Sequence, residues 1–221
     1  MSKLISVIMP VKNGEKYIKE AIQGIQNQKM DVEIIVVNDA STDNTGKIAE
    51  QMGCTVLNHE KTMGPVVAKN TGLKQAHGEY IMFHDGDDIM NEGALCALYD
   101  ILEADASLMA VMGKVKDFVS SDCQTNNSGN VAKPEPYYGL FTGAVLIRRS
   151  VFDIINSFSE KICSGEIMEW EGKMKECHLP IRRVDIITTN RRIHDHNFGK
   201  THRMTEFRDY AQILRQRLKK S

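Results

Sequence analysis

Three carboxylates fall within four residues in the segment Asp85-Gly86-Asp87-Asp88, which directly follows an apolar run. Carboxylates this close together repel one another unless a cation or solvent neutralises them. Mg²⁺ and Mn²⁺ commonly bind one or two protein carboxylates together with phosphate oxygens of a substrate. Asp85 and Asp87 are two residues apart, so an extended chain projects both to the same side. The segment therefore indicates a divalent-metal site, with a solvated acidic turn that caps the next helix as the alternative.

Asp39 follows a second apolar run, within the segment Asn38-Asp39-Ala40-Ser41-Thr42-Asp43. A carboxylate at the end of a strand can accept hydrogen bonds from a nucleotide base or ribose, as in other nucleotide-binding folds. Ser41, Thr42 and Asp43 are typical helix-capping residues, and we expect one of them to cap the next helix. Capping leaves Asp39 unexplained, so Asp39 is the candidate for ligand binding.

Two further segments carry polar side chains in weaker patterns. Pro10-Val11-Lys12-Asn13-Gly14 follows the first apolar run, and its backbone could line a base, although an ordinary Asn-Gly turn is the plainer interpretation. Lys69 and Asn70 lie in a predicted helix, where a surface lysine and a mid-helix asparagine are the commoner situation. Neither segment alone predicts a function.

The positions of these residues in the fold are set by an alternation of strands and helices in the first half of the chain. We expect strands at 4–10, 33–38, 55–58, 79–84 and 108–115, and helices at 15–28, 41–52, 65–76 and 92–103. The alternation predicts an α/β fold with a Rossmann-type, mostly parallel sheet and helices on both faces. Ligands of such sheets bind outside the carboxyl ends of the strands, and Asn13, Asp39 and Asp85 each fall just after one.

The second half of the chain has a different character. Residues 120–136 are rich in Ser, Asn, Asp, Gly and Pro and indicate a loop, and residues 190–203 form a polar stretch. We also expect strands at 140–149 and 181–189, a helix at 166–177 and a C-terminal helix with one apolar face. That face comprises Phe207, Tyr210, Leu214 and Leu218. No long linker divides the chain, so residues 1–221 are predicted to form one domain.

Composition excludes several classes of protein. The 221 residues are 42% hydrophobic and include 28 basic and 29 acidic residues, which argues against disorder and against nucleic-acid binding through bulk positive charge. No apolar run approaches the roughly 18 residues of a membrane span. The five cysteines are odd in number and far apart, which disfavours a disulfide framework or a structural zinc site. The default expectation is a reduced, cytoplasmic protein.

Taken together and in this order, the segments resemble family 2 of the inverting nucleotide-sugar glycosyltransferases, which have a GT-A fold. The resemblance is carried by residues 5–13, 36–43, 68–72, 78–88 and 142–149. It covers residues 2–103 closely and the remainder loosely. It implies a nucleotide-binding half, residues 1–115, and an acceptor half, residues 116–221, that includes the C-terminal helix.

The resemblance also implies roles for individual residues. Asp87 would bind a Mn²⁺ or Mg²⁺ ion that bridges the diphosphate, and Asp39 would hold the polar edge of the base. The residues assigned to the nucleotide are Pro10, Val11, Asn13, Asp39, Lys69 and Asp85. The residues assigned to the diphosphate or the acceptor are Asp88, Gly143, Ala144, Trp170, Arg192 and His194. For Arg192 and His194, the alternative is that they lie in an ordinary polar loop. A zinc site at the nearby histidines ranks below both the phosphate role and the loop.

Members of this family use a carboxylate base, usually the Asp of a Glu-Asp pair that opens a helix in the second half. This chain has Ile167 where that Asp is expected, directly after Glu166. Glu166 and Glu169 are three residues apart and share a helix face, so either could replace it. We favour Glu169, with Trp170 beside it as a platform for the sugar or the acceptor. The alternative is that both are surface acids near a positive helix N-terminus.

These assignments predict transfer of a sugar from a nucleotide-diphosphate donor, by default a UDP-sugar, to a hydroxyl of a glycan or glycolipid acceptor, with inversion. A sugar nucleotidyltransferase is the first alternative, but the loop after the first strand is too sparse in Gly and basic residues for that chemistry. A relative that binds nucleotide sugars without turnover is the second, and Ile167 is its best support. The basic C-terminal helix could contact a membrane surface, the domain itself or a second subunit of a homodimer, and we favour the last two.

Overall fold

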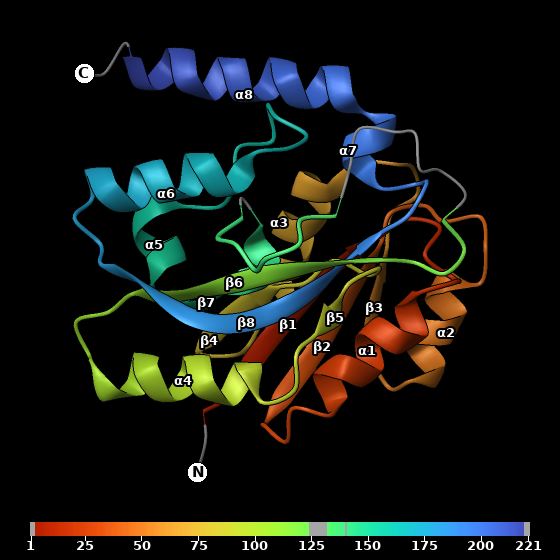
Figure 1. Ribbon diagram of the computed structural model, residues 1–221, viewed down its shortest axis with the longest axis horizontal. Coiled ribbons are helices and arrows are strands. Elements are labelled where there is room, and N and C mark those ends of the chain that lie inside the picture. The colour runs from red at the N-terminus through yellow and green to blue at the C-terminus, as the bar shows by residue number, and fades with distance from the viewer. Residues whose placement is uncertain (1–2, 124–131, 140, 219–221) are drawn as a thin grey trace.

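The structure, a computed structural model, describes residues 3–123, 132–139 and 141–218 of the chain. One sheet of eight strands, in the order β3-β2-β1-β4-β7-β6-β8-β5, is covered by helices on both faces (Figure 1). The strands are β1 (Ile5–Val11), β2 (Val32–Asn38), β3 (Thr55–Asn58), β4 (Tyr80–Phe83), β5 (Ile89–Met90), β6 (Ala110–Val119), β7 (Val145–Arg148) and β8 (Ile181–Ile193). The helices are α1 (Ile18–Gln26), α2 (Thr45–Gln51), α3 (Pro65–Gln75), α4 (Ala94–Ala104), α5 (Val151–Ile155), α6 (Glu166–Glu176), α7 (Phe198–Thr201) and α8 (Arg203–Leu218), with a short 3-10 turn η1 (Thr142–Ala144). The predicted α/β architecture is confirmed.

The first half of the chain builds the parallel part of the sheet. β1 lies between β2 and β4 and is parallel to both, with Ile8 opposite Ile35 in β2. These strands are apolar runs buried on both faces, as parallel strands covered by helices require. Their carboxyl ends meet at one edge of the sheet. There the backbone N–H of Asp39 donates to Val11 O at 2.8 Å, and that of His84 donates to Ile8 O at 2.9 Å.

The second half adds antiparallel pairs to the mostly parallel sheet. β7 lies between β4 and β6 and is antiparallel to both. β6 and β8 pair in parallel, with register shifts around Lys114 that accompany the curl of the sheet. β8 continues to Ile193, beyond the predicted end at 189, because β5 and the end of β6 both pair with this extension. Of the predicted loop at 120–136, residues 124–131 lie outside the described residues.

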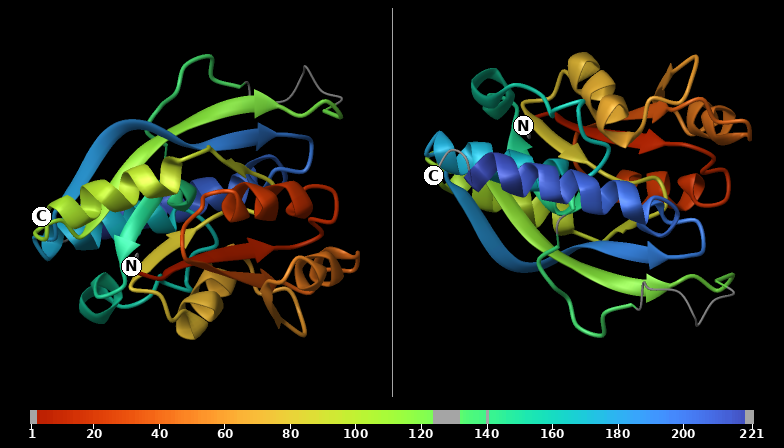
Figure 2. Two further views of the ribbon diagram at one scale, coloured as in Figure 1. Left: turned by 90° about the horizontal axis from the view of Figure 1, so that it is seen from below. Right: turned by 90° about the horizontal axis from the view of Figure 1, so that it is seen from above.

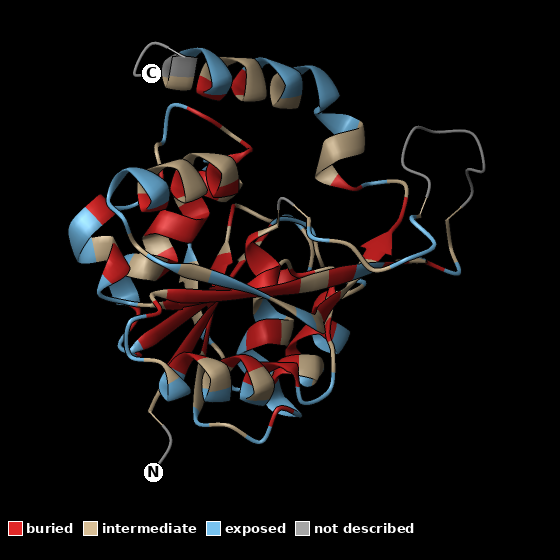
Figure 3. Cartoon of the chain, turned by 60° about the vertical axis from the view of Figure 1, so that its left-hand side comes forward, coloured by how far each residue is buried: buried red, intermediate tan, exposed pale blue. Residues whose placement is uncertain are grey.

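Two hydrophobic clusters fill the two faces of the sheet. One packs α1, α2 and α4 against the strands and includes Ile22, Val36 and Leu98. The other packs α3, α5 and α6 against the opposite face and includes Phe83 and Trp170. Figure 3 shows that burial concentrates in the strands and on the inner sides of the helices. Among the described residues, no helix is both long and apolar enough to cross a membrane.

Helix α8 lies outside α6, on the side of the sheet that α3 and α5 cover (Figures 1 and 2). The single apolar face predicted for it is wrong. Ile213 is buried against the domain and Tyr210 is half-buried, whereas Phe207 and Leu214 are exposed. The helix is rotated so that its contact with the domain is centred near Ile213, and the side chain of Leu218 lies outside the described part of the chain.

Candidate active site

Asp39 lies directly after β2, where Ala40 has a positive φ of 55° and turns the chain sharply. Asp39 is only 4% exposed, and its carboxylate accepts hydrogen bonds from the backbone N–H groups of Met63 at 2.8 Å and Gly64 at 2.9 Å. The Nδ1 atom of His59 lies 2.7 Å from the same carboxylate. Burial raises the pKa of Asp39, but these hydrogen bonds outweigh it and the net pKa is lowered. Asp39 is thus an ionised carboxylate held by the loop that leads into α3.

The acidic turn, defined here as residues 85–88, connects β4 to β5. Gly86 packs on the end of β1, where an added Cβ would lie 2.5 Å from the side chain of Val11. On the other side, Asp88 accepts a hydrogen bond from the backbone N–H of Arg192 at 2.9 Å, which ties the turn to β8. Asp88 therefore anchors the turn, a role different from the diphosphate or acceptor contact predicted for it.

The carboxylates of the acidic turn repel one another. Burial, and then the charges of Asp87 and Asp85, raise the pKa of Asp88 well above its usual range. Burial likewise raises the pKa of Asp85, while the charge of Lys69 opposes that rise. Protonation or a bound divalent cation would relieve this repulsion.

Asp87 is the member of the turn that is placed to hold such a cation. Its Oδ2 atom lies 2.9 Å from His194 Nε2 and 3.4 Å from Asn197 Nδ2. Carboxylate oxygen and imidazole nitrogen are both ligand types for first-row divalent metals. In the described part of the chain, no group of three or more His, Cys, Asp or Glu side chains is arranged to hold a metal. The described residues therefore do not form an all-protein metal cage, and an ion bound at Asp87 and His194 would have to take its other ligands from phosphate and water.

Arg192 is occupied within the protein. Its Nε donates to the carbonyl of Asp87 at 2.9 Å and its Nη2 donates to Glu20 at 2.5 Å. Its guanidinium carbon also lies 4.8 Å from the ring centre of Tyr17 and 4.7 Å from that of Phe118. Arg192 is therefore a support for the acidic turn and not a free ligand for phosphate, which corrects the prediction.

A buried ion pair joins the two halves of the chain beside the acidic turn. Lys69, on α3, donates from Nζ to Glu166 Oε1 at 2.5 Å and to Thr142 Oγ1 at 2.9 Å. Burial lowers the pKa of Lys69, but the charges of Glu166 and Asp85 outweigh burial and the net pKa is raised. The charged lysine therefore faces one carboxylate from each half of the chain.

The other predicted residues of α6 lie away from this ion pair. Glu169 accepts a hydrogen bond from the backbone N–H of Ser159 at 3.2 Å and pairs with a lysine one turn later. Trp170 is only 2% exposed and lies in the hydrophobic core, so its predicted role as a platform for sugar or acceptor is wrong. Ile167 is buried in the same core. The geometry favours Glu166 over Glu169 as the candidate base, the reverse of the sequence-based preference.

The turn η1 places Gly143 and Ala144 at the end of β4, where both are buried. The carbonyl of Gly143 accepts a hydrogen bond from Thr189 Oγ1 at 2.6 Å. A Cβ added to Gly143 would lie 3.5 Å from Phe83 O and 4.0 Å from His84 Cα. These two small residues therefore border the acidic turn, which is where the sugar or acceptor contact predicted for them would have to be.

Asn13 connects the loops that follow β1 and β2. It has a positive φ of 52°, its backbone N–H donates to Ser41 Oγ at 2.9 Å, and its Oδ1 accepts from Thr42 N at 2.9 Å. Its amide is thus engaged with protein. Of the two residues predicted to line the base, Pro10 is half-buried and Val11 is buried against the acidic turn.

Four residues that contact these groups are missing from the sequence-based set of site residues. His59 contacts Asp39, Asn197 contacts Asp87, and Thr142 contacts Lys69. The buried His84 has its Nδ1 atom 3.0 Å from the carbonyl of Asp85. His84 and Thr142 lie in segments that carry the family resemblance, and Asn197 lies in the polar stretch 190–203. Only His59 lies outside every marked segment, because tertiary packing brings it to Asp39.

Comparisons with known proteins identify the family to which these segments belong. A model of the family described as glycosyl transferase family 2 matches residues 6–159. The chain is 40% identical over 129 residues to glycosyltransferase GlyG of Streptococcus pneumoniae, covering 55% of this chain and 42% of that protein. It is 35% identical over 136 residues to the GalNAc(5)-diNAcBac-PP-undecaprenol beta-1,3-glucosyltransferase of Campylobacter jejuni, covering 58% and 41%. The chain thus spans less than half the length of either relative.

Comparison with a solved structure tests the predicted fold. The crystal structure of S. aureus TarS 1-349 in complex with UDP-GlcNAc matches this chain with a TM-score of 0.69 and 26% sequence identity, over 89% of this chain and 60% of that one. This likeness confirms the predicted GT-A-like fold. Because the family model matches more than half of the residues, the chain belongs to family 2 of the glycosyltransferases.

Proposed function

We propose that this chain transfers a sugar from a nucleotide-diphosphate sugar to a hydroxyl acceptor, with inversion at the anomeric carbon. The observation that carries the proposal is that the segments bearing Asp39 and the acidic turn meet at the end of β1, while Lys69 links the acidic turn to Glu166. Asp39 and the acidic turn both contact Val11 at the end of β1, and Lys69 faces both Asp85 and Glu166. Family membership favours this activity over that of a sugar nucleotidyltransferase.

A UDP-sugar is the proposed donor. TarS, one of the similar structures, is described in complex with UDP-GlcNAc. A carboxylate offers about four acceptor positions. Among the described residues, His59, Met63 and Gly64 contact the carboxylate of Asp39. We propose that a remaining position accepts a hydrogen bond from an N–H group on the edge of the base.

Glu166 is the proposed base. As the acceptor oxygen forms its bond to the anomeric carbon, the hydroxyl proton passes to the Glu166 carboxylate. The bond from the anomeric carbon to the diphosphate oxygen breaks on the opposite side, and its electron pair leaves with the nucleoside diphosphate. Lys69 holds Glu166 at the acidic turn, and Thr142 fixes the lysine in turn.

Asp87 and His194 are the proposed ligands of a Mn²⁺ or Mg²⁺ ion. Such an ion, when bound, stabilises the negative charge that grows on the departing diphosphate. The side chain of Asn197 helps to orient Asp87, and the guanidinium of Arg192 holds the backbone of the same residue. These contacts fix the position of the Asp87 carboxylate before any ligand arrives.

The proposed acceptor is a hydroxyl of a glycan or a glycolipid. The Campylobacter jejuni relative is named for an undecaprenol-linked glycan, and TarS of Staphylococcus aureus is named a poly(ribitol-phosphate) beta-N-acetylglucosaminyltransferase. Both names describe the addition of a sugar to a hydroxyl-bearing polymer or lipid-linked glycan.

Product analysis tests the proposal. The chain is incubated with Mn²⁺, a panel of UDP-, GDP-, CDP- and dTDP-sugars and simple hydroxyl acceptors, and products are followed by mass spectrometry and NMR. A glycoside of inverted anomeric configuration, formed together with free nucleoside diphosphate, is the expected result. A product that retains the donor configuration contradicts the proposed mechanism.

A second candidate function is the binding of a nucleotide sugar without turnover. It is favoured by Ile167, a buried apolar residue at the position where the family resemblance implies the Asp base. Thermal stabilisation by a nucleotide sugar, with no product from any donor in the panel, would select this candidate. Product formation excludes it.

A further inference from the structure

The outward side of α8 has an unusual composition. In the described part of this helix, the exposed residues are three arginines and three large apolar residues: Arg203, Met204, Phe207, Arg208, Leu214 and Arg215. At about 100° per residue, all six fall within about 140° of the helix circumference. Met204 is 81% exposed and Phe207 is 56% exposed. We call these six residues the outer face of α8.

The inner side of α8 fixes this orientation. Asp209 is fully buried, and its Oδ2 accepts hydrogen bonds from the backbone N–H groups of Cys163 at 2.7 Å and Ser164 at 3.3 Å. Tyr210 packs against Gly165, where a Cβ would lie 2.7 Å from its ring. The helix cannot rotate its apolar residues inward without breaking these contacts. The fold itself therefore turns the outer face away from the domain.

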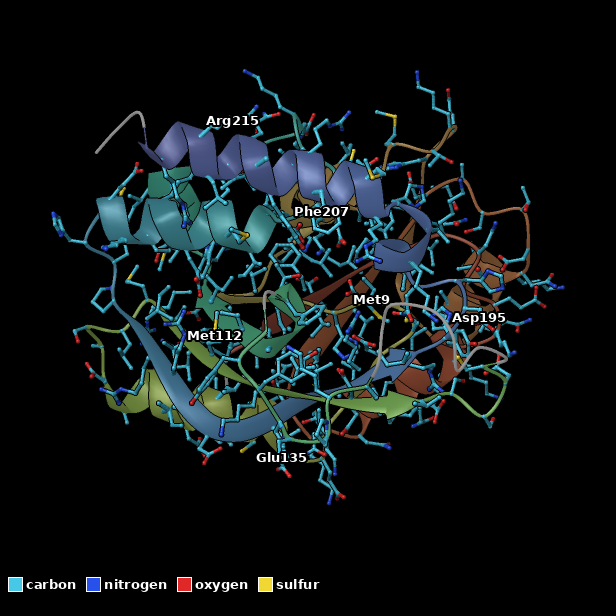
Figure 4. The ribbon with its side chains drawn as sticks, turned by 45° about the horizontal axis from the view of Figure 1, so that its top comes forward. Met9, Met112, Glu135, Asp195, Phe207 and Arg215 are labelled. Atoms are coloured by element: carbon cyan, nitrogen blue, oxygen red, sulfur yellow. The ribbon has the colours of Figure 1, made fainter. Side chains whose placement is uncertain are left out.

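The charges of the outer face are of one sign. Arg208 pairs with the buried Asp209 at 3.2 Å, and the guanidinium of Arg203 lies 5.5 Å from the ring centre of Phe207. The acidic residues of the helix are Glu206, which is half-buried beside Tyr210, and Asp209, which is buried. Figure 4 marks two members of the face, Phe207 and Arg215, on this helix.

The composition of the outer face favours one kind of binding partner. An apolar strip flanked by arginines is typical of a helix that lies in the headgroup region of an anionic lipid surface. A second copy of the chain is disfavoured, because a twofold contact would place the same face against itself and bring arginines together. We propose that the outer face of α8 docks on an anionic lipid membrane surface.

The position of α8 relates this surface to the candidate active site. The loop that α8 holds through Asp209 and Tyr210 leads directly into Glu166. A docked membrane would therefore lie beside the acceptor side of the site. The docking itself is independent of the proposed function, whereas its use for a lipid-linked acceptor rests on that function.

Vesicle sedimentation tests the docking. The chain is mixed with vesicles of phosphatidylglycerol and phosphatidylcholine, or with vesicles of phosphatidylcholine alone, in the absence of any sugar donor. We expect binding to the anionic vesicles that weakens as salt is raised. The double variant Arg203→Gln/Arg215→Gln should bind roughly 30-fold more weakly, since each cation at an anionic leaflet contributes about 1 kcal/mol. The double variant Phe207→Ser/Leu214→Ser should lose binding.

Matched controls come from another exposed element. Arg149→Gln and Ile154→Ser change an exposed arginine and an exposed apolar residue near α5, and both should bind as the unchanged chain does. Circular dichroism confirms that each variant is folded. The proposal is overturned if the anionic vesicles do not bind, if both kinds of vesicle bind equally, or if the controls weaken binding as much as the α8 variants. A dimer in light scattering that Phe207→Ser dissociates, without vesicle binding, would assign the face to a second copy of the chain. None of these outcomes depends on sugar transfer.

Discussion

Asp39 and the acidic turn follow the two strands that flank β1, yet their carboxylates are held in opposite electrostatic states. Asp39 lies among hydrogen-bond donors, which lower its pKa despite burial. Asp88 is buried beside two other carboxylates, and its pKa is raised. The comparison shows that the fold surrounds one carboxylate with hydrogen-bond donors and buries the other beside like charges.

The largest effect is expected at a third carboxylate, Glu166, which is paired with a buried lysine. Glu166→Gln keeps the shape of the side chain and removes its basicity, so kcat should fall roughly 10²–10⁴-fold while donor affinity is kept. Glu169→Gln, on the same helix, is the matched control and should leave kcat near that of the unchanged chain. Steady-state kinetics and calorimetric titration with UDP measure both quantities. If only Glu169→Gln loses activity, the base lies one helical turn away.

The next largest effect is expected at the acidic turn. Asp87→Ala removes the proposed metal ligand, and the Mn²⁺-dependent part of UDP affinity should fall on the order of 100-fold, because metal–phosphate contacts contribute several kcal/mol. Asp100→Ala removes an exposed carboxylate on α4 and serves as the control. Calorimetric titration with UDP, with and without Mn²⁺, gives the difference. An unchanged titration for Asp87→Ala removes the metal assignment.

A pH series should sharpen the contrast between Asp39 and Asp88. The stability that Asp39 contributes is present above its unfolded pKa of about 4 and is lost as pH falls through its lowered folded pKa. Asp88 has the opposite sign: the stability of its neutral form is present at low pH and is lost as pH rises through its raised folded pKa.

Two conservative variants test the opposite pH dependence of stability expected at Asp39 and Asp88. Asp39→Asn leaves a buried N–H unpaired and should cost about 1–3 kcal/mol at neutral pH, with the cost shrinking below about pH 4. Asp88→Asn keeps its carbonyl oxygen for the Arg192 N–H and should stabilise the chain at neutral pH without added metal. Urea unfolding from about pH 3 to about pH 8 measures both. Parallel profiles for the two variants would show that the carboxylates are not held in opposite states.

The smallest effect is expected at Asn13, which ties together the ends of β1 and β2. Asn13→Gly keeps the positive φ without strain and removes the side-chain hydrogen bond to Thr42, so stability should fall by about 1 kcal/mol. UDP affinity should change little. Urea unfolding and calorimetry measure the two effects. A larger loss of affinity than of stability would return Asn13 to the nucleotide-binding role that the sequence predicts.

The sequence predicts the first half of the site well for a physical reason. In parallel strands the apolar run ends where the sheet ends, so polar residues such as Asp39 and Asp87 are placed by topology at one edge. The family resemblance also predicts the order in which these segments occur along the chain. It does not predict which hydrogen-bond partner each side chain has. For that reason it assigns Arg192 to phosphate, although that side chain is engaged with Glu20 and the backbone of Asp87.

The second half is predicted less well because its site residues are placed by contacts distant in sequence. Glu166 is positioned by Lys69, 97 residues away, and no local pattern reveals that pairing. Helical spacing alone puts Glu166 and Glu169 on one face and does not distinguish them. An aromatic residue such as Trp170 has the same local sequence signal in a core as at a sugar subsite.

The short pairing between β5 and β8 gives the acidic turn a second anchor. The turn leaves β4 in the first half and enters β5, where Ile89 lies opposite Asn190 and Met90 opposite Thr189. A ligand whose binding shifted β8 would therefore also shift Asp87 through this pairing. Thermodynamic linkage would then require that ligand and one bound at Asp87 to change each other's affinity by the same factor. Such coupling would be carried by a ladder only two residues long.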